Sequence, residues 1–173
     1  ESMVQAKLNL NHFLVGHGSS TVPQELVNEI NSLGGEIKSA SGVPMEKIKE
    51  GIKFGLRKIN IDTDLRLAIT AVVRKYLLDN SGIEDKFPET LGRIKKAFSG
   101  EIPMMAKGKP QDPKGVIDPR GYFGVIDINY LRGPATPESG LREMMKLIEI
   151  RIADHVAMLV EEFGSAGLAG KVK

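Results

Sequence analysis

The stretch FLVGHGSSTVPQELVNEI, residues 13–30, decides the fold. It begins with an apolar run, breaks at a polar segment rich in glycine and serine, and continues with the apolar spacing of a helix. This pattern predicts a short buried strand over Asn11 to Val15 and a helix over Pro23 to Leu33, with a proline in its first turn. Ser20 or Thr21 is expected to cap that helix. The polar segment therefore lies where a strand gives way to a helix.

The same alternation of elements continues along the chain. Apolar residues at helical spacing predict a second helix over Pro44 to Gly55, and RKINID, residues 57–62, is typical of a second strand. A long helix is then expected over Thr63 to Asn80. Strand, helix, strand and helix joined by short links are typical of a parallel sheet with right-handed crossovers. The sequence therefore predicts an α/β fold.

The pattern weakens after residue 80. Residues 88–99 could form a helix, whereas residues 100–124 are rich in Gly, Pro and Lys and are expected to be irregular surface chain. Helical spacing returns over residues 138–163, where the methionines are expected to fill the core. We therefore expect three parts: a βαβα unit over residues 1–80, an irregular insertion or loop region over 81–137, and a helix with a tail over 138–173.

Composition narrows the classes of protein to which the chain can belong. The 173 residues are 41% hydrophobic and 27% charged, which is typical of one globular domain with a core. A net charge of only +2 argues against a nucleic-acid partner. No apolar run approaches the length of a membrane span. The absence of cysteine excludes disulfides and thiolate metal sites and permits a cytoplasmic location.

The polar segment after the first strand is a candidate binding site. Ligands of parallel α/β sheets bind beyond the carboxyl ends of the strands. Gly18 would let a ligand approach the backbone, Ser19 and Ser20 offer hydroxyls, and the free amides of a helix start favour an anion. The alternative is a capped turn in which His17 only satisfies a carbonyl. Taken alone, these residues favour that alternative.

The second strand has a polar end of its own. Asn60 and Asp62 share one face of that strand, and Asp62 or Thr63 would cap the helix that follows. A helix cap with nothing bound remains the simpler interpretation of this stretch alone. Polar ends on two consecutive strands are more informative, because the last loops of eight-stranded barrels often build a phosphate site. We therefore expect the amides around Ser20 and Thr63 to converge on one anion.

The histidines limit what metal chemistry the chain could support. His12 and His17 differ by an odd number, so on one strand they point to opposite faces, and His155 lies in the last helix. A catalytic zinc needs about three protein ligands. Only His17 is a plausible ligand, so residues outside this chain would have to complete a zinc site.

Several stretches together resemble the carboxyl-terminal half of a class II, zinc-dependent fructose-1,6-bisphosphate aldolase. They are VGHGSSTVPQELVNEIN (residues 15–31), GVPMEKIKEGIKFGLRKINIDTDLRLA (42–68), DPR (118–120) and FGSAGLAGKVK (163–173). The resemblance implies a (β/α)8 TIM barrel, which typically takes ~250 residues. This chain would supply about the last two strands with their helices, plus a helical tail.

The resemblance also implies an activity and a set of site residues. The family reversibly cleaves fructose 1,6-bisphosphate to dihydroxyacetone phosphate and glyceraldehyde 3-phosphate, in glycolysis and gluconeogenesis, with zinc and in some members a monovalent cation. His17 resembles a zinc ligand. The residues that resemble substrate and phosphate contacts are Gly18, Ser19, Ser20, Asn60, Asp62, Thr63 and Arg120. The acid/base aspartate of the family precedes this region, so no catalytic residue is expected within the chain, which alone should be inactive.

Other functions remain open from the sequence. The chain could be a catalytically silent half-barrel that serves as a structural or regulatory partner, another phosphate-binding barrel enzyme, or an aldolase for another ketose bisphosphate such as tagatose bisphosphate. Arg120 could simply pair with Asp118. The expected partners are a sugar bisphosphate, the missing amino-terminal half of the barrel and further copies in a homo-oligomer. The expected location is the cytoplasm, or a plastid in an alga.

Overall fold

The computed structural model describes residues 13–38, 40–132 and 139–171. His12 and the first part of the predicted strand lie outside these ranges, as does the predicted start of the last helix. The strands are β1 (Leu14–Gly16), β2 (Leu56–Ile59), β3 (Met104–Ala106) and β4 (Lys109–Gln111). The α-helices are α2 (Gln24–Ser32), α3 (Met45–Lys53), α4 (Thr63–Asp79), α5 (Ile83–Lys86), α6 (Arg93–Ser99), α7 (Pro119–Phe123) and α8 (Leu141–Glu162). Shorter turns of 3-10 helix cover Ile128–Tyr130 and Ala169–Lys171, and a π-helix covers Pro88–Gly92.

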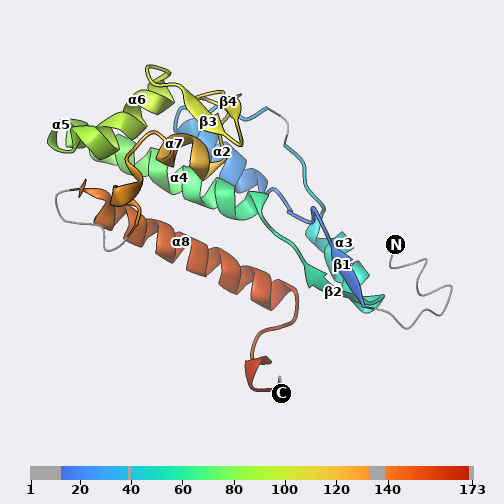
Figure 1. The fold of residues 1–173 in the computed structure, drawn as a ribbon. Coiled ribbons are helices and arrows are strands. Elements are labelled where there is room, and N and C mark those ends of the chain that lie inside the picture. Colours follow the sequence, from blue (N-terminus) through green and yellow to red (C-terminus); the bar gives the residue numbers. More distant parts are fainter. Residues whose placement is uncertain (1–12, 39, 133–138, 172–173) are drawn as a thin grey trace.

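The strands β1 and β2 form a parallel two-stranded sheet, which confirms the predicted βαβ order. Leu14 pairs with Leu56 and Gly16 with Ile59, with an irregular register between Leu14 and Val15. Helix α3 lies beside this sheet, and the three elements stand apart from the main helical body (Figure 1). Since α3 precedes β2 directly in the chain, it makes the last part of the crossover between the two strands.

Helix α4 is the centre of the helical body. Helix α8 runs along one side of it, and α2 also packs against it (Figure 1). Contact with several elements buries α4 on more than one side, and Leu67, Ala68, Val73 and Leu77 are all buried. The larger core cluster joins α4 to α6, α7 and α8. Its buried members are Val73, Tyr76, Leu77, Leu91, Ile94, Ala97, Met104, Val116, Tyr122, Ile126, Leu141, Met144 and Ile148.

The expectation of irregular chain over residues 100–124 is wrong in part. Strands β3 and β4 pair as an antiparallel hairpin, and Met104 and Ala106 of β3 are buried. The hairpin turns at Lys107 and Gly108, which both have positive φ. The strands are short and the apolar pattern is interrupted by prolines and lysines, so their alternation is too brief to be recognised. This segment therefore contributes to the core and is not a loop lying on the surface.

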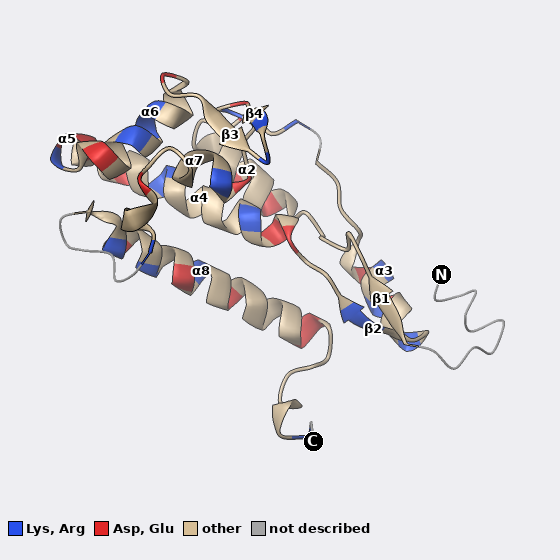
Figure 2. Ribbon diagram, in the orientation of Figure 1, with Lys and Arg blue, Asp and Glu red and all other residues tan. Residues whose placement is uncertain are grey.

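Helix α8 connects the helical body to the sheet. Figure 2 shows basic residues near its start and acidic residues near its end, an order that opposes the helix dipole. At the carboxyl end, Glu162 forms an ion pair with Lys49 of α3. None of the helices in the described ranges combines the length and apolar character that a membrane crossing requires.

The packing of α4 predicts a difference between two adjacent leucines. Leu77 is 7% exposed within the core, whereas Leu78 is 64% exposed. Leu77→Ala should lower the free energy of unfolding by about 2–5 kcal/mol because it removes buried methyl groups and leaves a cavity. Leu78→Ala should change it by no more than about 0.5 kcal/mol. Urea titrations followed by circular dichroism measure both values, and similar losses for the two variants would contradict the assigned packing.

Candidate functional site

The chain segments that follow β1 and β2 stay paired beyond the ends of the strands. The Asn60 amide donates to the Gly16 carbonyl at 2.9 Å, and the Ser19 amide donates to the Asn60 carbonyl at 3.3 Å. These two bonds place residues 17–20 directly against residues 60–63. The two polar strand ends that the sequence singled out therefore form one site at the carboxyl edge of the sheet.

His17 and Asn60 meet across this edge. Asn60 Nδ2 lies 3.0 Å from His17 Nδ1, and the imidazole is exposed. If the amide nitrogen donates, His17 carries its own proton on Nε2. If the amide is rotated so that its oxygen accepts from Nδ1, the lone pair of Nε2 becomes available to a metal. Only the second orientation leaves His17 able to act as a metal ligand.

Ser20 caps a different helix from the one predicted. Its Oγ accepts hydrogen bonds from the amides of Asp62 at 3.1 Å and Thr63 at 3.0 Å, so it caps α4. Helix α2 begins after Pro23 with no side-chain cap from the residues that the structure describes. The prediction that Ser20 or Thr21 caps α2 is wrong, because the turn at residues 20–22 directs both side chains toward α4. The amides of Asp62 and Thr63 share the Ser20 oxygen as their acceptor, and the binding of one anion by the amides around Ser20 and Thr63 stays a prediction.

The prediction that the Asp62 or Thr63 side chain caps α4 is also wrong. Asp62 is the residue before the helix, but its carboxylate makes no cap bond within the described ranges. It accepts instead from Arg66 Nε at 2.7 Å. The Asp62 carboxylate thus pairs with the guanidinium one helical turn further on.

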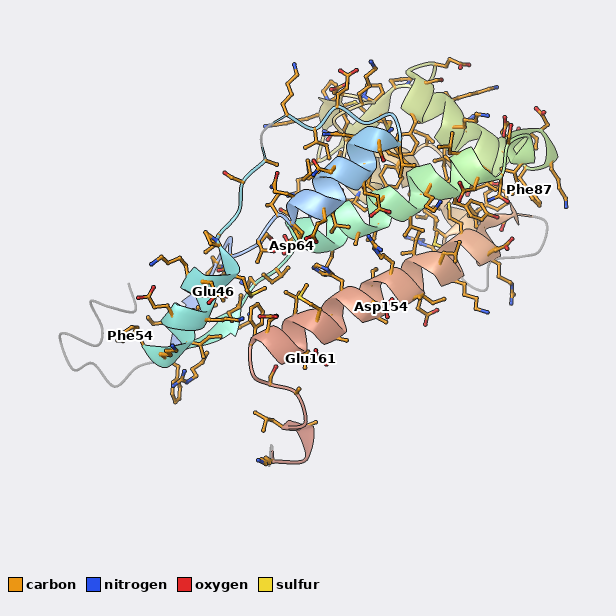
Figure 3. All side chains as sticks on the ribbon, turned by 180° about the vertical axis from the view of Figure 1, so that it is seen from behind. Glu46, Phe54, Asp64, Phe87, Asp154 and Glu161 are labelled. Atoms are coloured by element: carbon orange, nitrogen blue, oxygen red, sulfur yellow. The ribbon has the colours of Figure 1, made fainter. Side chains whose placement is uncertain are left out.

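Asp64, which no sequence pattern singled out, holds the loop that contains Ser20. Its carboxylate is fully buried at the start of α4 (Figure 3). It accepts from the Thr21 amide at 2.9 Å, the Thr21 hydroxyl at 2.7 Å and the Val22 amide at 2.9 Å. Val22 has a φ of 51°, which is strained for a β-branched residue. The carboxylate therefore fixes a backbone conformation that the loop would not adopt by itself.

Arg120 is connected to this site through a chain of charges. Its guanidinium forms two bonds with Asp118, Nε to Oδ1 at 2.9 Å and Nη2 to Oδ2 at 2.6 Å. Asp118 also pairs with Arg66 Nη1 at 2.7 Å, and Arg66 pairs with Asp62. The local pair expected as the alternative for Arg120 is therefore present. This pair also belongs to a network of alternating basic and acidic side chains, which ends at Asp62 beyond the carboxyl end of β2.

The charges of this network act mainly on Asp118. Hydrogen bonds from Arg120, together with the charge of Arg66, hold the pKa of the Asp118 carboxyl well below its usual value, although partial burial opposes them. Asp118 therefore stays ionised and keeps both guanidiniums in place. Sequence analysis did not single out Arg66, although its position four residues after Asp62 on a predicted helix is a recognised signal for an ion pair. Asp64 gave no such signal, because an acidic residue in a first turn is common.

The site therefore gathers groups that suit an oxygen-rich anion. It offers an imidazole, a side-chain amide, hydroxyls and two guanidiniums, all at one edge of a parallel sheet. Within the ranges that the structure describes, no three histidine or acidic side chains lie close enough together to hold a metal ion. A metal at His17 would thus need ligands from elsewhere.

Comparison with known proteins gives this geometry a context. The chain is 63% identical over 62 residues to fructose-bisphosphate aldolase of Xanthobacter flavus, a match covering 36% of this chain and 18% of that protein. It is 56% identical over 77 residues to the aldolase of Pseudomonas aeruginosa, covering 44% and 22%. It is 57% identical over 86 residues to the plasmid-encoded aldolase of Cupriavidus necator, covering 50% and 25%. The matched stretches thus span a quarter or less of each of these relatives.

A broader match extends over nearly the whole sequence. The sequence model of the family described as "Fructose-bisphosphate aldolase class-II" matches residues 2–168. This range includes both strand ends, the acidic and basic network, and helix α8. With so much of its length matched, the chain belongs to the class-II fructose-bisphosphate aldolase family.

Proposed function

We propose that this chain supplies the carboxyl half of the active site of an aldolase that reversibly cleaves fructose 1,6-bisphosphate to dihydroxyacetone phosphate and glyceraldehyde 3-phosphate. The observation that carries the proposal is the meeting of His17 and Asn60 at the ends of two parallel strands, 3.0 Å apart. Family membership supports the reaction class. The acid/base aspartate would come from outside this chain, which alone would be inactive.

The fold belongs to the same proposal. Parallel strands in barrels are covered on both faces, and a two-stranded sheet alone is marginally stable. Here Phe13 is 80% exposed and Val15 is 43% exposed. This exposure supports a role for β1 and β2 as the last two strands of a (β/α)8 barrel, with the preceding strands from the amino-terminal half covering them. The division into residues 1–80, 81–137 and 138–173, and the homo-oligomer, remain predictions of this proposal.

Zinc is the proposed cofactor, and His17 would be its one ligand from this chain. The imidazole fits because it is exposed and because Asn60 can accept from Nδ1 and orient the ring. When bound, zinc would polarise the substrate ketone. Asn60 would also contact the dihydroxyacetone moiety. The remaining ligands, and any monovalent cation, would lie outside the described residues.

The two phosphates of the substrate would bind at opposite ends of the site. Gly18, Ser19 and Ser20 would hold the ketose phosphate together with the backbone near Asp62 and Thr63. Ser20 supports this role because its oxygen already accepts from both amides, which leaves its hydroxyl hydrogen to donate to a phosphate oxygen. Arg120 would bind the second phosphate, for which its planar, always charged guanidinium is well suited.

The zinc proposal predicts a difference between two histidines. His17→Ala should reduce the zinc content of the purified aldolase assembly to near background, because one of about three protein ligands is lost. His155→Ala, a change on helix α8, should leave the zinc content unchanged. Elemental analysis by mass spectrometry measures both. A wild-type assembly without zinc would instead support the silent half-barrel.

The phosphate proposal predicts a selective effect at Arg120. Arg120→Ala should raise the KM for fructose 1,6-bisphosphate while leaving the KM for fructose 1-phosphate nearly unchanged, because the shorter substrate lacks the second phosphate. Zinc content should stay constant. Steady-state kinetics of the assembled enzyme test this, and equal losses for both substrates would show that Arg120 acts through folding.

Asp64 should matter for both stability and binding. Asp64→Asn keeps the shape of the side chain. It replaces one of the two carboxylate oxygens, which together accept three hydrogen bonds, with an NH2 group that can only donate. We expect a loss of about 1–3 kcal/mol in unfolding free energy, together with a raised KM for both substrates. Asp85→Asn, on an exposed side chain, is the matched control. Unaltered kinetics in Asp64→Asn would mean that the loop conformation does not depend on this carboxylate.

A further inference from the structure

A polar stripe runs along one side of helix α4. Asp62, Arg66, Thr70 and Arg74 follow one another at intervals of four residues, so they lie on the same face of the helix. Thr70 is fully buried and Arg74 is 7% exposed. The first two members belong to the network that reaches Arg120. The last two have no place in the proposed function.

Thr70 and Arg74 bind the segment that leads into Arg120. Thr70 Oγ1 donates to the Ile117 carbonyl at 3.3 Å and lies 3.1 Å from the hydroxyl of Tyr122. Arg74 Nη2 donates to the carbonyls of Pro113 at 2.6 Å and Lys114 at 3.3 Å. The residues bound by Thr70 and Arg74 lie on both sides of Arg120 in the sequence. The stripe thus binds residues 113–122 from one end to the other, in the opposite direction to the helix.

The position of Arg74 is unusual for a charged residue. Its guanidinium lies over the ring of Phe98, 4.3 Å from the centroid, and burial lowers its pKa. No carboxylate forms an ion pair with it among the described residues. Backbone carbonyls, the aromatic face and the charge of Asp112 stabilise the guanidinium, while its buried Nε has no hydrogen-bond partner among the described residues. Burial of such a charge costs free energy, which the hydrogen bonds to the bound segment offset in part.

The chain between the end of α4 and Pro113 gives a structural reason for this attachment. After α4 ends at Asp79, the chain forms α5, α6 and the β3–β4 hairpin before it returns to α4 at Pro113. Any movement of these elements would be transmitted to Asp118 and Arg120 if the returning segment were loose. Thr70 and Arg74 bind the carbonyls of residues 113, 114 and 117, and so fix the chain to α4 immediately before Asp118.

We propose that Thr70 and Arg74 are positioning residues that hold Arg120 where it can bind the second phosphate of the substrate. The inference rests on the proposed function for the identity of that ligand. The attachment itself does not depend on the proposed function and can be measured separately. The attachment is called the α4 clamp below and consists of Thr70, Arg74 and the groups they bind.

The first experiment measures the attachment in the chain itself. Hydrogen–deuterium exchange of peptides covering residues 115–124 is compared in wild type, Thr70→Val, Thr70→Ser and Arg74→Lys. Thr70→Val should speed exchange about fivefold to tenfold, the size expected for one lost hydrogen bond. Thr70→Ser retains a hydroxyl and should restore slow exchange. Arg74→Lys should also speed exchange, since lysine lacks the planar fork.

Thr90→Val is the matched control. Thr90 is 2% exposed and its hydroxyl donates to the Ser139 carbonyl, away from the α4 clamp. The Thr90→Val variant loses a buried hydrogen bond of the same kind as Thr70→Val, so its free energy of unfolding should fall by a similar amount. Exchange over residues 115–124 should not change. Equal exchange rates in wild type and Thr70→Val, or equally fast exchange in both valine variants, would overturn the clamp.

The second experiment measures function in the assembled aldolase. Thr70→Val should raise the KM for fructose 1,6-bisphosphate about fivefold, with kcat and the KM for fructose 1-phosphate unchanged, and Thr70→Ser should restore it. Thr90→Val should leave all three values unchanged. Faster exchange without a change in this KM, in an enzyme where Arg120→Ala does raise it, would overturn the positioning role. If Arg120→Ala itself has no effect, the proposed phosphate contact is wrong, and the exchange result alone decides whether the clamp exists.

Discussion

The hydroxyl of Ser20 is the group on which the rest of the site depends. It comes from the loop after β1, and it accepts from the amides of Asp62 and Thr63, where the helix that follows β2 begins. In return, Asp64 from that helix accepts three hydrogen bonds from the same loop. Each loop thus supplies the polar partners that the other needs. This exchange places His17 beside Asn60 without any side chain from elsewhere in the fold.

Reciprocal capping of this kind could not be predicted from local sequence rules. Those rules pair a hydroxyl with the next helix in the chain, and they assigned Ser20 or Thr21 to α2 and Asp62 or Thr63 to α4. The actual partners are separated by 42 residues or more. The order of the elements and the nearness of the two strand ends were predictable, because both follow from apolar periodicity and from the geometry of parallel sheets. The choice of partner across the edge depends on tertiary packing.

The same distinction applies to the remainder of the chain. Helices α4 and α8 were predicted within a few residues because their apolar spacing persists over many turns. The β3–β4 hairpin was missed because three-residue strands interrupted by lysine and proline carry almost no periodic signal. Arg120 was identified by resemblance alone, and its pair with Asp118 by proximity in sequence. Its connection to Asp62 through Arg66 needed the fold, since helix α4 brings Arg66 to Asp118 across 52 residues of chain.

The α4 clamp also bears on how this part of the chain can vary in length. Closing a flexible loop costs conformational entropy that grows only with the logarithm of its length, so each doubling adds roughly 0.6 kcal/mol. The elements between Asp79 and Pro113 begin and end on the same helix, so both ends of this part of the chain are attached to α4. Insertions at an exposed turn of this segment, such as Lys107–Gly108, would change mainly this small entropy and would leave the path from Arg74 onward the same. The buried side chains of the segment, such as Leu91, Ile94 and Met104, must be kept because they are part of the core. The exposed turns between residues 80 and 112 are therefore places where the chain can accept a foreign segment at a small cost in free energy.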